Sequence, residues 1–516
     1  MVECQLTCDE YALLWPKPKS AQLGKTVSTV SVSRIDLVND DSGDVQVIKM
    51  LHRIINDQIA WMKLKSNEQS PNSSEHELRI TYLGGDGNST EPKICRESQE
   101  GYTLSTAKAG SVITIEDLPK FSHRGISLDT SRNFIPAKTF KHDPIRCTLN
   151  TRSINTQDQI KDILEYANYR GVQVIPEQNQ PAHVGHGWNF PGAENYTVCL
   201  NAEPWYDYCV EPPCGQLNPG EAEIYNVLEK LYTEFYDMLC SNSPRSTWEQ
   251  MKSISRSGTR ANWYLTTWLK LDVIRRKKLW CEFQEKSSAK LKSVYETKKD
   301  ENETSLRIIV WTSRITLPEY NDNLDPDTYT IQIWTKGSNN LSDPTISSLL
   351  DKGYDVIFSN YESTYLNCGF GAWVGEGKNW CSPYMGWQEL YENDIYKLVE
   401  RRGFQLTDKI KSQILGGETN MWSEQVDNTL VEGNIFPRSN TFAERLWSNP
   451  STNWYEAETR ILNHRHSLVQ RGIRAAALQP EWFRLNEGQC YGNTDTPNFE
   501  IAASETTTDT LEASST

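Results

Sequence analysis

The sequence GISLD (125–129) is followed by IKDILEYANYRG (160–171) and VQVIPE (172–177), and these three pieces decide the fold class. The first and third are short runs rich in β-forming apolar residues. The middle piece has apolar residues at helical spacing and ends at a glycine, a common stop residue of a helix. We therefore expect a strand, a helix and a strand, the unit from which parallel sheets are built.

The same unit repeats further along the chain. Four more apolar runs are RIIVWTS (307–313), YTIQIWT (329–335), YDVIFSN (354–360) and SQILGGE (412–418), and helical patterns such as TISSLLDKG (345–353) lie between some of them. Repeated parallel strands that end in polar or aromatic residues predict an α/β fold with a (β/α)8 TIM barrel, whose site lies at the carboxyl ends of the strands. A Rossmann sheet is the alternative, but no GxGxxG sequence follows a strand.

Sequence patterns divide the chain into three parts. Residues 1–120 contain an alternating pattern, VSTVSVSRIDLV (27–38), and a helical one, LHRIINDQIAWMKLK (51–65), which predict a smaller N-terminal α+β domain. Residues 121–490 hold the repeated units of the barrel domain. Residues 491–516 are rich in Ser, Thr and acidic residues, so we expect a disordered tail.

The composition fits a protein that handles sugars. The net charge of −15 argues against nucleic acid and anionic lipid as partners, since both require clustered Lys and Arg. We expect no membrane span, because no run approaches the roughly 20 apolar residues that a membrane helix needs. The chain has 17 Trp and 23 Tyr, and aromatic rings stack on the flat C–H faces of sugars. On composition alone, a large core that contains Trp is the favoured interpretation.

Cysteine usage indicates an oxidising compartment. Several of the 12 cysteines lie in short loops, namely Cys4 with Cys8, Cys209 with Cys214, and Cys368 with Cys381. Sequons for N-glycosylation occur at Asn72, Asn88, Asn195, Asn302 and Asn340. We therefore expect a secreted, lysosomal or extracellular glycoprotein. The chain begins MVECQLTC without the pattern of a signal peptide, so it begins after a removed signal or its start is incomplete.

Several strand ends carry residues suited to a pyranose site. HRGISLDTSRNF (123–134) places Arg124 and Asp129 around a strand, and VIPEQNQPAHVGHGW (174–188) supplies His183. A single Trp at a strand end is more often a packing residue, but the order of the motifs is specific. Together with AERLW (443–447) and LQPEW (478–482), they resemble glycoside hydrolase family 20, the β-N-acetylhexosaminidases, over about residues 4–490.

The resemblance implies an N-terminal α+β domain before a catalytic barrel, and it implies roles for matching residues. Arg124 resembles the arginine that forks onto hydroxyls of the terminal sugar, a bidentate task that suits Arg better than Lys. The aromatic walls around the N-acetyl group and the ring face would be Trp311, Trp334 and Trp422. Glu424 resembles the carboxylate that accepts from sugar hydroxyls.

Three further roles follow from the same resemblance. Tyr365 and Asn367 stand where the family places a Tyr and an Asp or Asn that hold the acetamido group. His183 matches a histidine in a hydrogen-bond relay behind the catalytic acid. The implied activity is removal of terminal non-reducing GlcNAc from chitooligosaccharides or N-glycans by substrate-assisted retaining hydrolysis.

A loop sequence resembles the arthropod members that hydrolyse chitooligosaccharides. In AEPWYDYCVEPPCGQLNP (202–219), the resemblance implies that a longer cleft is lined by Trp205, Val210, Glu211 and, from another loop, Trp380. Trp380 would stack on the next sugar. The alternative is a disulfide-closed surface loop without function.

The residues that would perform the chemistry are missing. Glycoside hydrolysis normally uses two carboxyl groups. In this family the acetamido oxygen of the substrate attacks instead, an Asp orients it, and the adjacent Glu of an HxGGDE motif is the general acid. No GGDE occurs in this chain. The expected segment, 240–263, contains one acid, Glu249, without an Asp beside it, so the catalytic Asp–Glu pair is absent as written.

A second segment is also missing. Between FIPAKTF (134–140) and IKDILEYA (160–167) the family has a further helix and strand with an HWHxxD motif, whose Asp supports the relay histidine. The connection here, residues 141–159, is too polar and short to hold them. A barrel strand and its helix are therefore expected to be absent, and a missing strand leaves two unpaired edges.

Reading the codons of STWEQMKS (246–253) out of frame gives a candidate for the lost motif. Taking the last base of each codon with the first two of the next forces one Gly and one Glu, and permitted codons elsewhere give His-Met-Gly-Ala-Asp-Glu-Val. We hypothesise that this segment is the family motif translated out of frame, and that the first gap is a skipped exon. Transcript codons incompatible with His and Asp in the shifted frame would refute this.

Three interpretations remain open from the sequence. The chain is an exo-acting β-N-acetylhexosaminidase by descent, an inactive sugar-binding pseudoenzyme, or a defective gene product without a stable barrel. The partner implied is a carbohydrate with terminal GlcNAc, and the family also implies a homodimer. No metal or cofactor is expected, because the chain has only 8 His and no HExxH motif.

Overall fold

The structure of this chain is a computed structural model. It describes residues 16, 17, 20–22, 35–37, 78–81, 102–106, 114–137, 139, 155–168, 170, 172–184, 187, 188, 190–240, 250–254, 273–299, 306–335 and 344–485. The predicted helix at 51–65 and the predicted tail at 491–516 lie outside the described residues.

The N-terminal part contains a five-stranded sheet in the order β1-β5-β4-β3-β2. Its strands are β1 (Ser20–Gln22), β2 (Ile35–Leu37), β3 (Leu78–Thr81), β4 (Tyr102–Thr106) and β5 (Thr114–Asp117). Strands β2 and β3 are parallel, and the other pairs are antiparallel. The next strand belongs to another sheet, and the domain boundary at residue 120 stays a prediction.

The second sheet has seven strands, all parallel, in the order β6-β14-β13-β12-β11-β10-β7. They are β6 (His123–Leu128), β7 (Glu177–Asn179), β10 (Gln250–Ile254), β11 (Arg307–Trp311), β12 (Tyr329–Ile333), β13 (Asp355–Phe358) and β14 (Ile414–Met421). Every strand of β11–β14 overlaps its predicted apolar run. The strand expected at 172–177 is wrong in position, because pairing begins only at Glu177.

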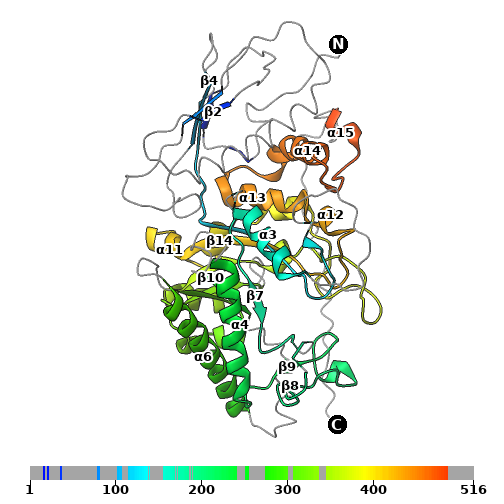
Figure 1. Cartoon of the computed structure of the whole chain (residues 1–516). Helices are drawn as coiled ribbons and strands as arrows, with labels where there is room; N and C mark the ends of the chain where they lie inside the picture. Colours follow the sequence, from blue (N-terminus) through cyan, green and yellow to red (C-terminus); the bar gives the residue numbers. More distant parts are fainter. Residues whose placement is uncertain are drawn as a thin grey trace.

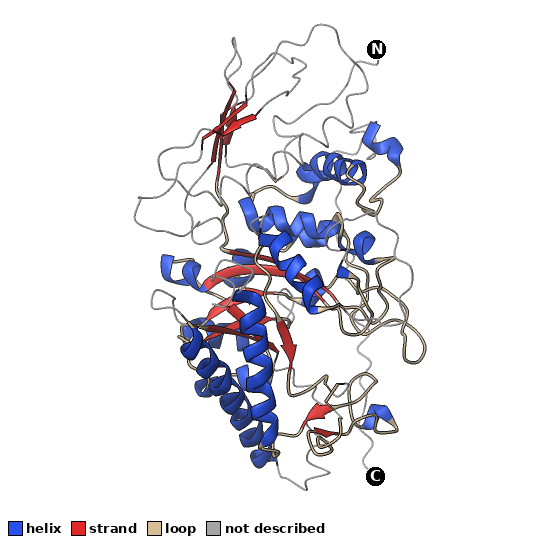
Figure 2. Cartoon of the chain, in the orientation of Figure 1, coloured by secondary structure: helices blue, strands red, loops and turns tan. Residues whose placement is uncertain are grey.

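Helices surround this curled sheet (Figures 1 and 2). Helix α3 (Gln157–Asn168) contacts α4 (Glu223–Cys240), α4 packs along α6 (Val273–Lys298), and α7 (Thr345–Asp351) contacts strand β13. The later helices are α8 (Tyr361–Thr364), α9 (Trp387–Glu392), α10 (Ile395–Glu400), α11 (Asp408–Gln413), α12 (Val431–Ile435), α13 (Arg438–Ser448), α14 (Trp454–Gln470) and α15 (Glu481–Leu485). None of the described helices is long and apolar enough to cross a bilayer.

The sheet does not close among the described residues, since β6 and β7 stand at its two edges without pairing to each other. Between these two strands the chain contributes one described helix, α3, where two barrel units would require two helices and a further strand. The prediction of an incomplete (β/α)8 barrel is therefore confirmed.

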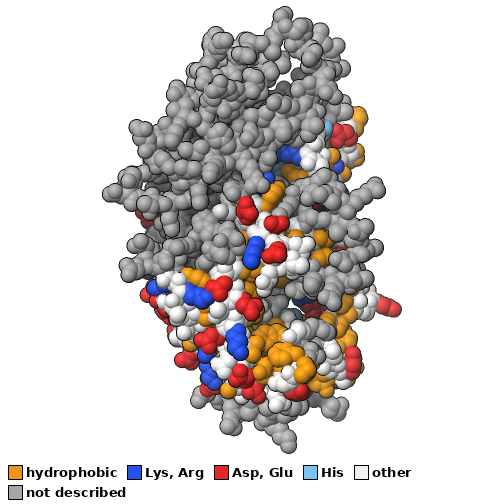
Figure 3. All heavy atoms as spheres, in the orientation of Figure 1, with side chains coloured by type: hydrophobic (Ala, Val, Ile, Leu, Met, Phe, Trp, Pro, Cys, Tyr) orange, Lys and Arg blue, Asp and Glu red, His pale blue; other side chains and the backbone are white. Residues whose placement is uncertain are grey.

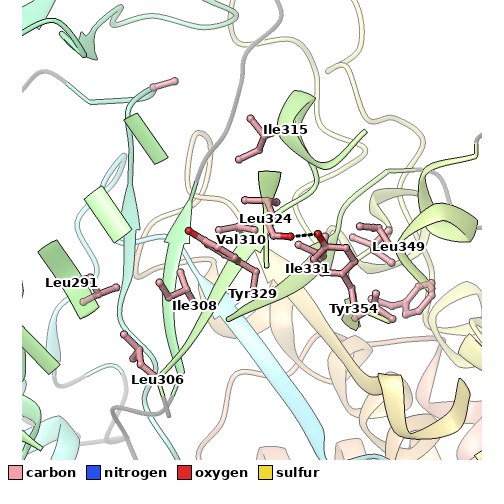
Figure 4. Packing of buried hydrophobic residues seen from close by; sticks show 14 of the residues in the cluster. Leu291, Leu306, Ile308, Val310, Ile315, Leu324, Tyr329, Ile331, Leu349 and Tyr354 are labelled. Atoms are coloured by element: carbon pink, nitrogen blue, oxygen red, sulfur yellow. Dashed lines mark hydrogen bonds between the residues drawn. The ribbon is translucent and has the colours of Figure 1, made fainter. Parts of the chain in front are cut away.

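The core lies between the sheet and its helices. Residues of β11 and β12 such as Ile308, Val310 and Ile331 are fully buried, and Figure 4 shows them packed with Leu324 and Leu349. Burial of such side chains from both sides is the usual state of a parallel strand. In Figure 3, acidic and basic side chains alternate on the surface over α3, α4 and α6, as the mixed surface of a globular protein requires.

Candidate active site

The candidate active site lies at the carboxyl ends of the parallel strands. Asp129 directly follows β6, Trp311 ends β11, Trp334 directly follows β12, and Trp422 directly follows β14. Parallel strands bring their carboxyl ends to one edge of the sheet, so residues almost 300 positions apart along the chain meet there. The strand-end residues predicted from the sequence are therefore on one face of the fold.

Five of the predicted aromatic residues form one cluster. The ring centroids of Trp311 and Trp422 are 6.0 Å apart, and those of Tyr365 and Trp422 are 5.9 Å apart. Trp380 lies 6.3 Å from Trp334 and 6.2 Å from Tyr365, edge-on to both. Trp311, Tyr365 and Trp422 are buried, whereas Trp380 is 61% exposed. We call the three buried rings, Trp311, Tyr365 and Trp422, the box. Trp380 packs beside the box at the protein surface.

An arginine joins this box to a group of carboxylates. The guanidinium of Arg132 lies 5.6 Å from the ring centroid of Trp422. Its Nη1 donates to Asp129 Oδ2 at 2.8 Å, and its Nε donates to Glu211 Oε1 at 3.0 Å and lies 3.3 Å from Glu424 Oε1. Three acids therefore converge on one cation, beside the face of an indole ring.

The charges in this group shift each other's proton affinity. Burial alone would raise the pKa of Asp129, but the Arg132 charge and the N–H groups of Ser131 and Ser423 hold that pKa below its usual value. Burial raises the pKa of Glu424, and the neighbouring Glu211 adds to this while Arg132 opposes it. Burial would lower the pKa of Arg132, but the three carboxylates raise it. Of Asp129 and Glu424, Glu424 therefore takes up a proton first as the pH falls.

Asp129 fixes the geometry of the cluster. Its carboxylate accepts from the backbone N–H groups of Ser131 and Ser423 at 2.9 and 3.1 Å, which ties the end of β6 to the end of β14. Asn133 donates from Nδ2 to the Ser423 carbonyl at 2.7 Å and strengthens the same link. The two hydrogen bonds to the Asp129 carboxylate have an ionised acceptor and are therefore stronger than neutral ones. Asp129, which binds Arg132, is thus itself firmly held.

A loop brings Glu211 to the cluster. This loop is closed by the predicted disulfide between Cys209 and Cys214, and Glu211 lies between the two cysteines. His183 has its Nδ1 3.8 Å from Glu211 Oε1, and both residues line one small pocket with Val210, which is 43% exposed. The predicted relay histidine and the predicted cleft residue are thus neighbours.

The predicted acetamido residues follow β13. Tyr365 is paired with Asn420 of β14 in a parallel bridge, and Leu366 donates its N–H to the Asn420 carbonyl at 2.8 Å. Asn367 is buried, its Oδ1 has no hydrogen-bond partner among the described residues, and its carbonyl accepts from Asn379. The second predicted disulfide, Cys368–Cys381, closes the loop that ends at Trp380. A buried acceptor without a partner is suited to a ligand donor.

The structure does not bring Arg124 into the site. Its Nη1 donates to the Phe121 carbonyl, and its guanidinium lies 5.2 Å from the ring of Trp447 on α13. Successive residues of a strand point to opposite faces. His123 reaches Glu418 at 2.7 Å on the inner face, so Arg124, the next residue, points outward to the helices. The expectation that Arg124 forks onto a sugar therefore conflicts with its position.

Sequence reasoning did not single out Arg132, whose guanidinium lies over Trp422 of the aromatic cluster, whereas that of Arg124 lies over Trp447. Both arginines belong to the quoted HRGISLDTSRNF segment, but Arg132 stands beyond the carboxyl end of β6 and Arg124 near its start. The rule that barrel sites lie at carboxyl ends was sufficient to choose between them. Trp205 is placed in the short helix η1 (Trp205–Asp207), where it packs against Tyr206.

Strand β10 lies in the part of the chain where the resemblance places the acidic motif. It consists of residues 250–254 and pairs with β11 on one side and β7 on the other. Residues 250–253, the last four of the out-of-frame segment 246–253, thus fall on a strand of the sheet. Glu249 lies outside the described residues.

Comparisons with known proteins agree with this geometry. Residues 145–450 match the family model described as glycosyl hydrolase family 20, catalytic domain. The chitooligosaccharidolytic β-N-acetylglucosaminidase of Ostrinia furnacalis is 32% identical over 95% of this chain and 91% of its own length, and that of Bombyx mori is 33% identical with the same coverage. The first alignment spans 579 positions, more than the 516 residues of this chain, so that relative has residues without a counterpart here.

Solved structures support the fold. The N-acetyl-β-hexosaminidase of Streptomyces plicatus in complex with Thio-NAglucal aligns with a TM-score of 0.60 at 16% identity, over 92% of this chain and 97% of that one. The family match over more than half of the chain and the identity to the two insect enzymes leave one assignment. This chain belongs to glycosyl hydrolase family 20 and is, by family, a glycoside hydrolase.

Proposed function

We propose that the site binds the terminal, non-reducing N-acetylglucosamine of a chitooligosaccharide or N-glycan, as a β-N-acetylhexosaminidase does. The observation that carries this proposal is the buried box of Trp311, Tyr365 and Trp422 with Arg132 and Glu424 at its rim. Indole faces match the C–H faces of a pyranose and an acetamido methyl group. The names of the two insect relatives point to the same sugar.

The polar groups divide the sugar between them. Arg132 presents N–H donors to ring hydroxyls, and Glu424 has a buried oxygen, Oε2, that has no hydrogen-bond partner among the described residues and accepts from a hydroxyl. We assign the acetamido group to Tyr365, a wall of the box, and to Asn367, two residues further along the chain. We assign the sugar fork to Arg132 and not to Arg124, because only Arg132 faces the box.

The exposed rim fits further sugars of a chain. Trp380 extends the box outward with a ring that is 61% exposed, and Val210 and Glu211 stand on the disulfide-closed loop beside Arg132. Trp205 lies in η1, which directly precedes this loop. This arrangement supports a substrate with a second sugar stacked on Trp380, hence chitin fragments in preference to a single ring.

Hydrolysis requires the Asp–Glu pair, which this chain lacks as written. Without the acid, the leaving oxygen has no proton donor, and without the Asp, the attacking acetamido group has no orienting charge. His183 then has no acid to relay to and stands against Glu211. A sugar-binding protein without turnover is therefore the second candidate function, favoured by this one absence.

Calorimetry on the full chain tests the binding proposal. We expect N-acetylglucosamine to bind and chitobiose to bind more tightly, with glucose, which lacks the acetamido group, as the matched control sugar. Trp422→Ala removes a wall of the box and is expected to weaken binding of N-acetylglucosamine by about 5- to 150-fold, given roughly 1–3 kcal/mol for a lost stacking face. Equal affinity for glucose and N-acetylglucosamine contradicts the proposal.

The cellular setting follows from the same features. The disulfides Cys209–Cys214 and Cys368–Cys381 support an oxidising compartment, secreted or lysosomal. We also propose the division into an N-terminal domain (1–120), a barrel domain (121–490) and a tail (491–516), and a homodimer, which sedimentation of the purified chain tests.

A further inference from the structure

Two consecutive turns before the short strand β8 (Thr197–Val198) hold one asparagine outward. The Ala193 N–H donates to the Phe190 carbonyl at 2.9 Å, and the Tyr196 N–H donates to the Ala193 carbonyl at 3.0 Å. Ala193 and Tyr196 are buried, so both turns are anchored to the fold. Asn195 stands between the two anchors and is exposed. β8 pairs with β9 (Gln216–Leu217), and both strands are labelled near the bottom of Figure 1.

The backbone around Asn195 is fixed while its side chain is not engaged. Asn218 donates from Nδ2 to the Asn195 carbonyl at 3.0 Å and from its own N–H to the Tyr196 carbonyl at 2.9 Å. The side-chain amide of Asn195 makes no hydrogen bond to the described residues. An amide held outward on a rigid turn is accessible to an enzyme that modifies it.

An exposed aromatic ring packs on Tyr196, the residue that follows Asn195. Phe190 is 46% exposed, and its ring packs edge-on against Tyr196 with the centroids 5.8 Å apart. Tyr196 is the neighbour of Asn195 in the chain. A singly exposed apolar side chain is ordinary on a protein surface, but Phe190 belongs to the same pair of turns as Asn195 and packs on its neighbour Tyr196. The exposed face of its ring suits a C–H face of a sugar.

The sequence around Asn195 is a modification signal. Asn195, Tyr196 and Thr197 form an N-x-[ST] sequon. It is the one sequon of five that lies within the described residues. The two disulfides indicate a compartment where N-glycosylation takes place.

We propose that Asn195 carries an N-linked oligosaccharide whose first N-acetylglucosamine ring covers Phe190. The donor is a lipid diphosphate-linked oligosaccharide. The Asn195 Nδ2 attacks the anomeric carbon, the bond from that carbon to the phosphate oxygen breaks, the N-glycosidic bond forms, and the amide proton leaves with the lipid diphosphate. This modification is independent of sugar binding at the strand ends.

Peptide mass spectrometry tests the attachment. The full chain is expressed behind a secretion signal in insect cells, and an amidase that removes N-glycans in heavy-oxygen water converts an occupied Asn195 to labelled Asp. We expect the peptide with residue 195 to be labelled, and Asn195→Gln to lose the mass of one glycan. Asn226→Gln, an exposed asparagine of α4 outside a sequon, is the matched control and is expected to lose none.

A double-mutant cycle tests the contact with the ring. We expect Phe190→Ala to lower the Tm of the glycosylated protein by roughly 2–4 °C, and to change the Tm of the Asn195→Gln protein much less, because there is then no sugar to lose. An unlabelled Asn195 in protein whose other sequons are occupied overturns the proposal. Equal effects of Phe190→Ala in both backgrounds overturn the covering of Phe190.

Discussion

The two sides of the parallel sheet differ in which parts of the candidate site they carry. Strands β11 to β14 and β6 form one side of the sheet, with a register shift between β13 and β14. The residues proposed to face the sugar, Trp311, Trp334, Trp422 and Arg132, stand at or just beyond the ends of these strands. Strands β7 and β10 form the other side, and β7 is an edge strand of three residues. The family's catalytic acids belong to this second side, by the position of the expected motif.

Under the proposed function, this difference means that binding and chemistry occupy separable parts of one barrel. The aromatic walls and the arginine depend on strands that are present, so we expect their geometry to form without the acids. The acid pair depends on one strand end, so we expect a defect there to remove the chemistry and leave the box. A chain of this kind is expected to recognise a sugar that it does not cleave.

The largest expected effect concerns turnover. The chain as written should hydrolyse a chromogenic GlcNAc glycoside at least about 10⁴-fold more slowly than a chain with the His-Met-Gly-Ala-Asp-Glu-Val frame and the first gap restored from the transcript. Loss of the general acid and of the orienting Asp each removes orders of magnitude. Equal rates for the two chains would contradict the idea that the chemistry depends on the strand that lacks the acids.

Exchanging each arginine for lysine sharpens the binding side of the comparison. Arg132→Lys is expected to weaken binding of N-acetylglucosamine about 10- to 100-fold, since a charge-assisted hydrogen bond contributes roughly 1.5–3 kcal/mol and Lys lacks the planar fork. Arg124→Lys is the matched control and should leave calorimetric affinity unchanged, because Arg124 lies over Trp447 on the outer face. If Arg124→Lys weakens binding and Arg132→Lys does not, Arg124 is the arginine that binds the sugar hydroxyls, as the sequence resemblance implies.

The pH dependence of binding follows from Glu424. Burial raises its pKa above the usual 4.5, so the folded protein protonates this acid at a higher pH than an exposed Glu. Protonation removes a hydroxyl acceptor and the ion pair with Arg132. Affinity should fall by up to about tenfold per pH unit below that raised pKa. Affinity measured from pH 7 to 4 should be flat for Glu424→Gln, and a persisting slope there refutes the assignment.

Asp129 and Glu424 change the free energy of unfolding in opposite directions as the pH changes. The pKa of Asp129 is lowered in the folded state, so its contribution is present above its usual 3.8 and is lost as the pH falls through the lower value. Glu424 has a raised folded pKa, so its ionisation opposes folding as the pH rises through that value. The unfolding temperature of Asp129→Asn, compared with that of the unchanged chain, should therefore be lowered most near neutral pH and least at low pH.

The smallest expected effect concerns Glu211. Its carboxylate bonds Arg132 where a sugar hydroxyl would bind, so Glu211→Gln should tighten binding of N-acetylglucosamine by roughly three- to tenfold through loss of a competing charge-assisted bond. Val210→Ala, the adjacent exposed residue, serves as the control. Weaker binding of the monosaccharide by Glu211→Gln shows instead that Glu211 contacts the first sugar.

Much of the fold was accessible from local pattern. The runs at 307–313, 329–335 and 354–360 became β11, β12 and β13, because buried parallel strands require continuous apolar runs. The run at 172–177 did not become a strand until its last residue. Pairing needs a neighbour, and β10 lies opposite 177–179 only. Register of this kind depends on contacts far along the chain.

The sequence by itself determined the family, the parallel architecture, the two loop disulfides and the absence of a GGDE motif, because each is written in local residue order. Only the tertiary structure decided which arginine faces the sugar box and that Glu211 is held on it. Strand alternation sends Arg124 outward, and the ends of β6 and β14 meet at Asp129 to place Arg132 over Trp422. These are contacts across nearly 300 residues of chain, which local pattern does not encode.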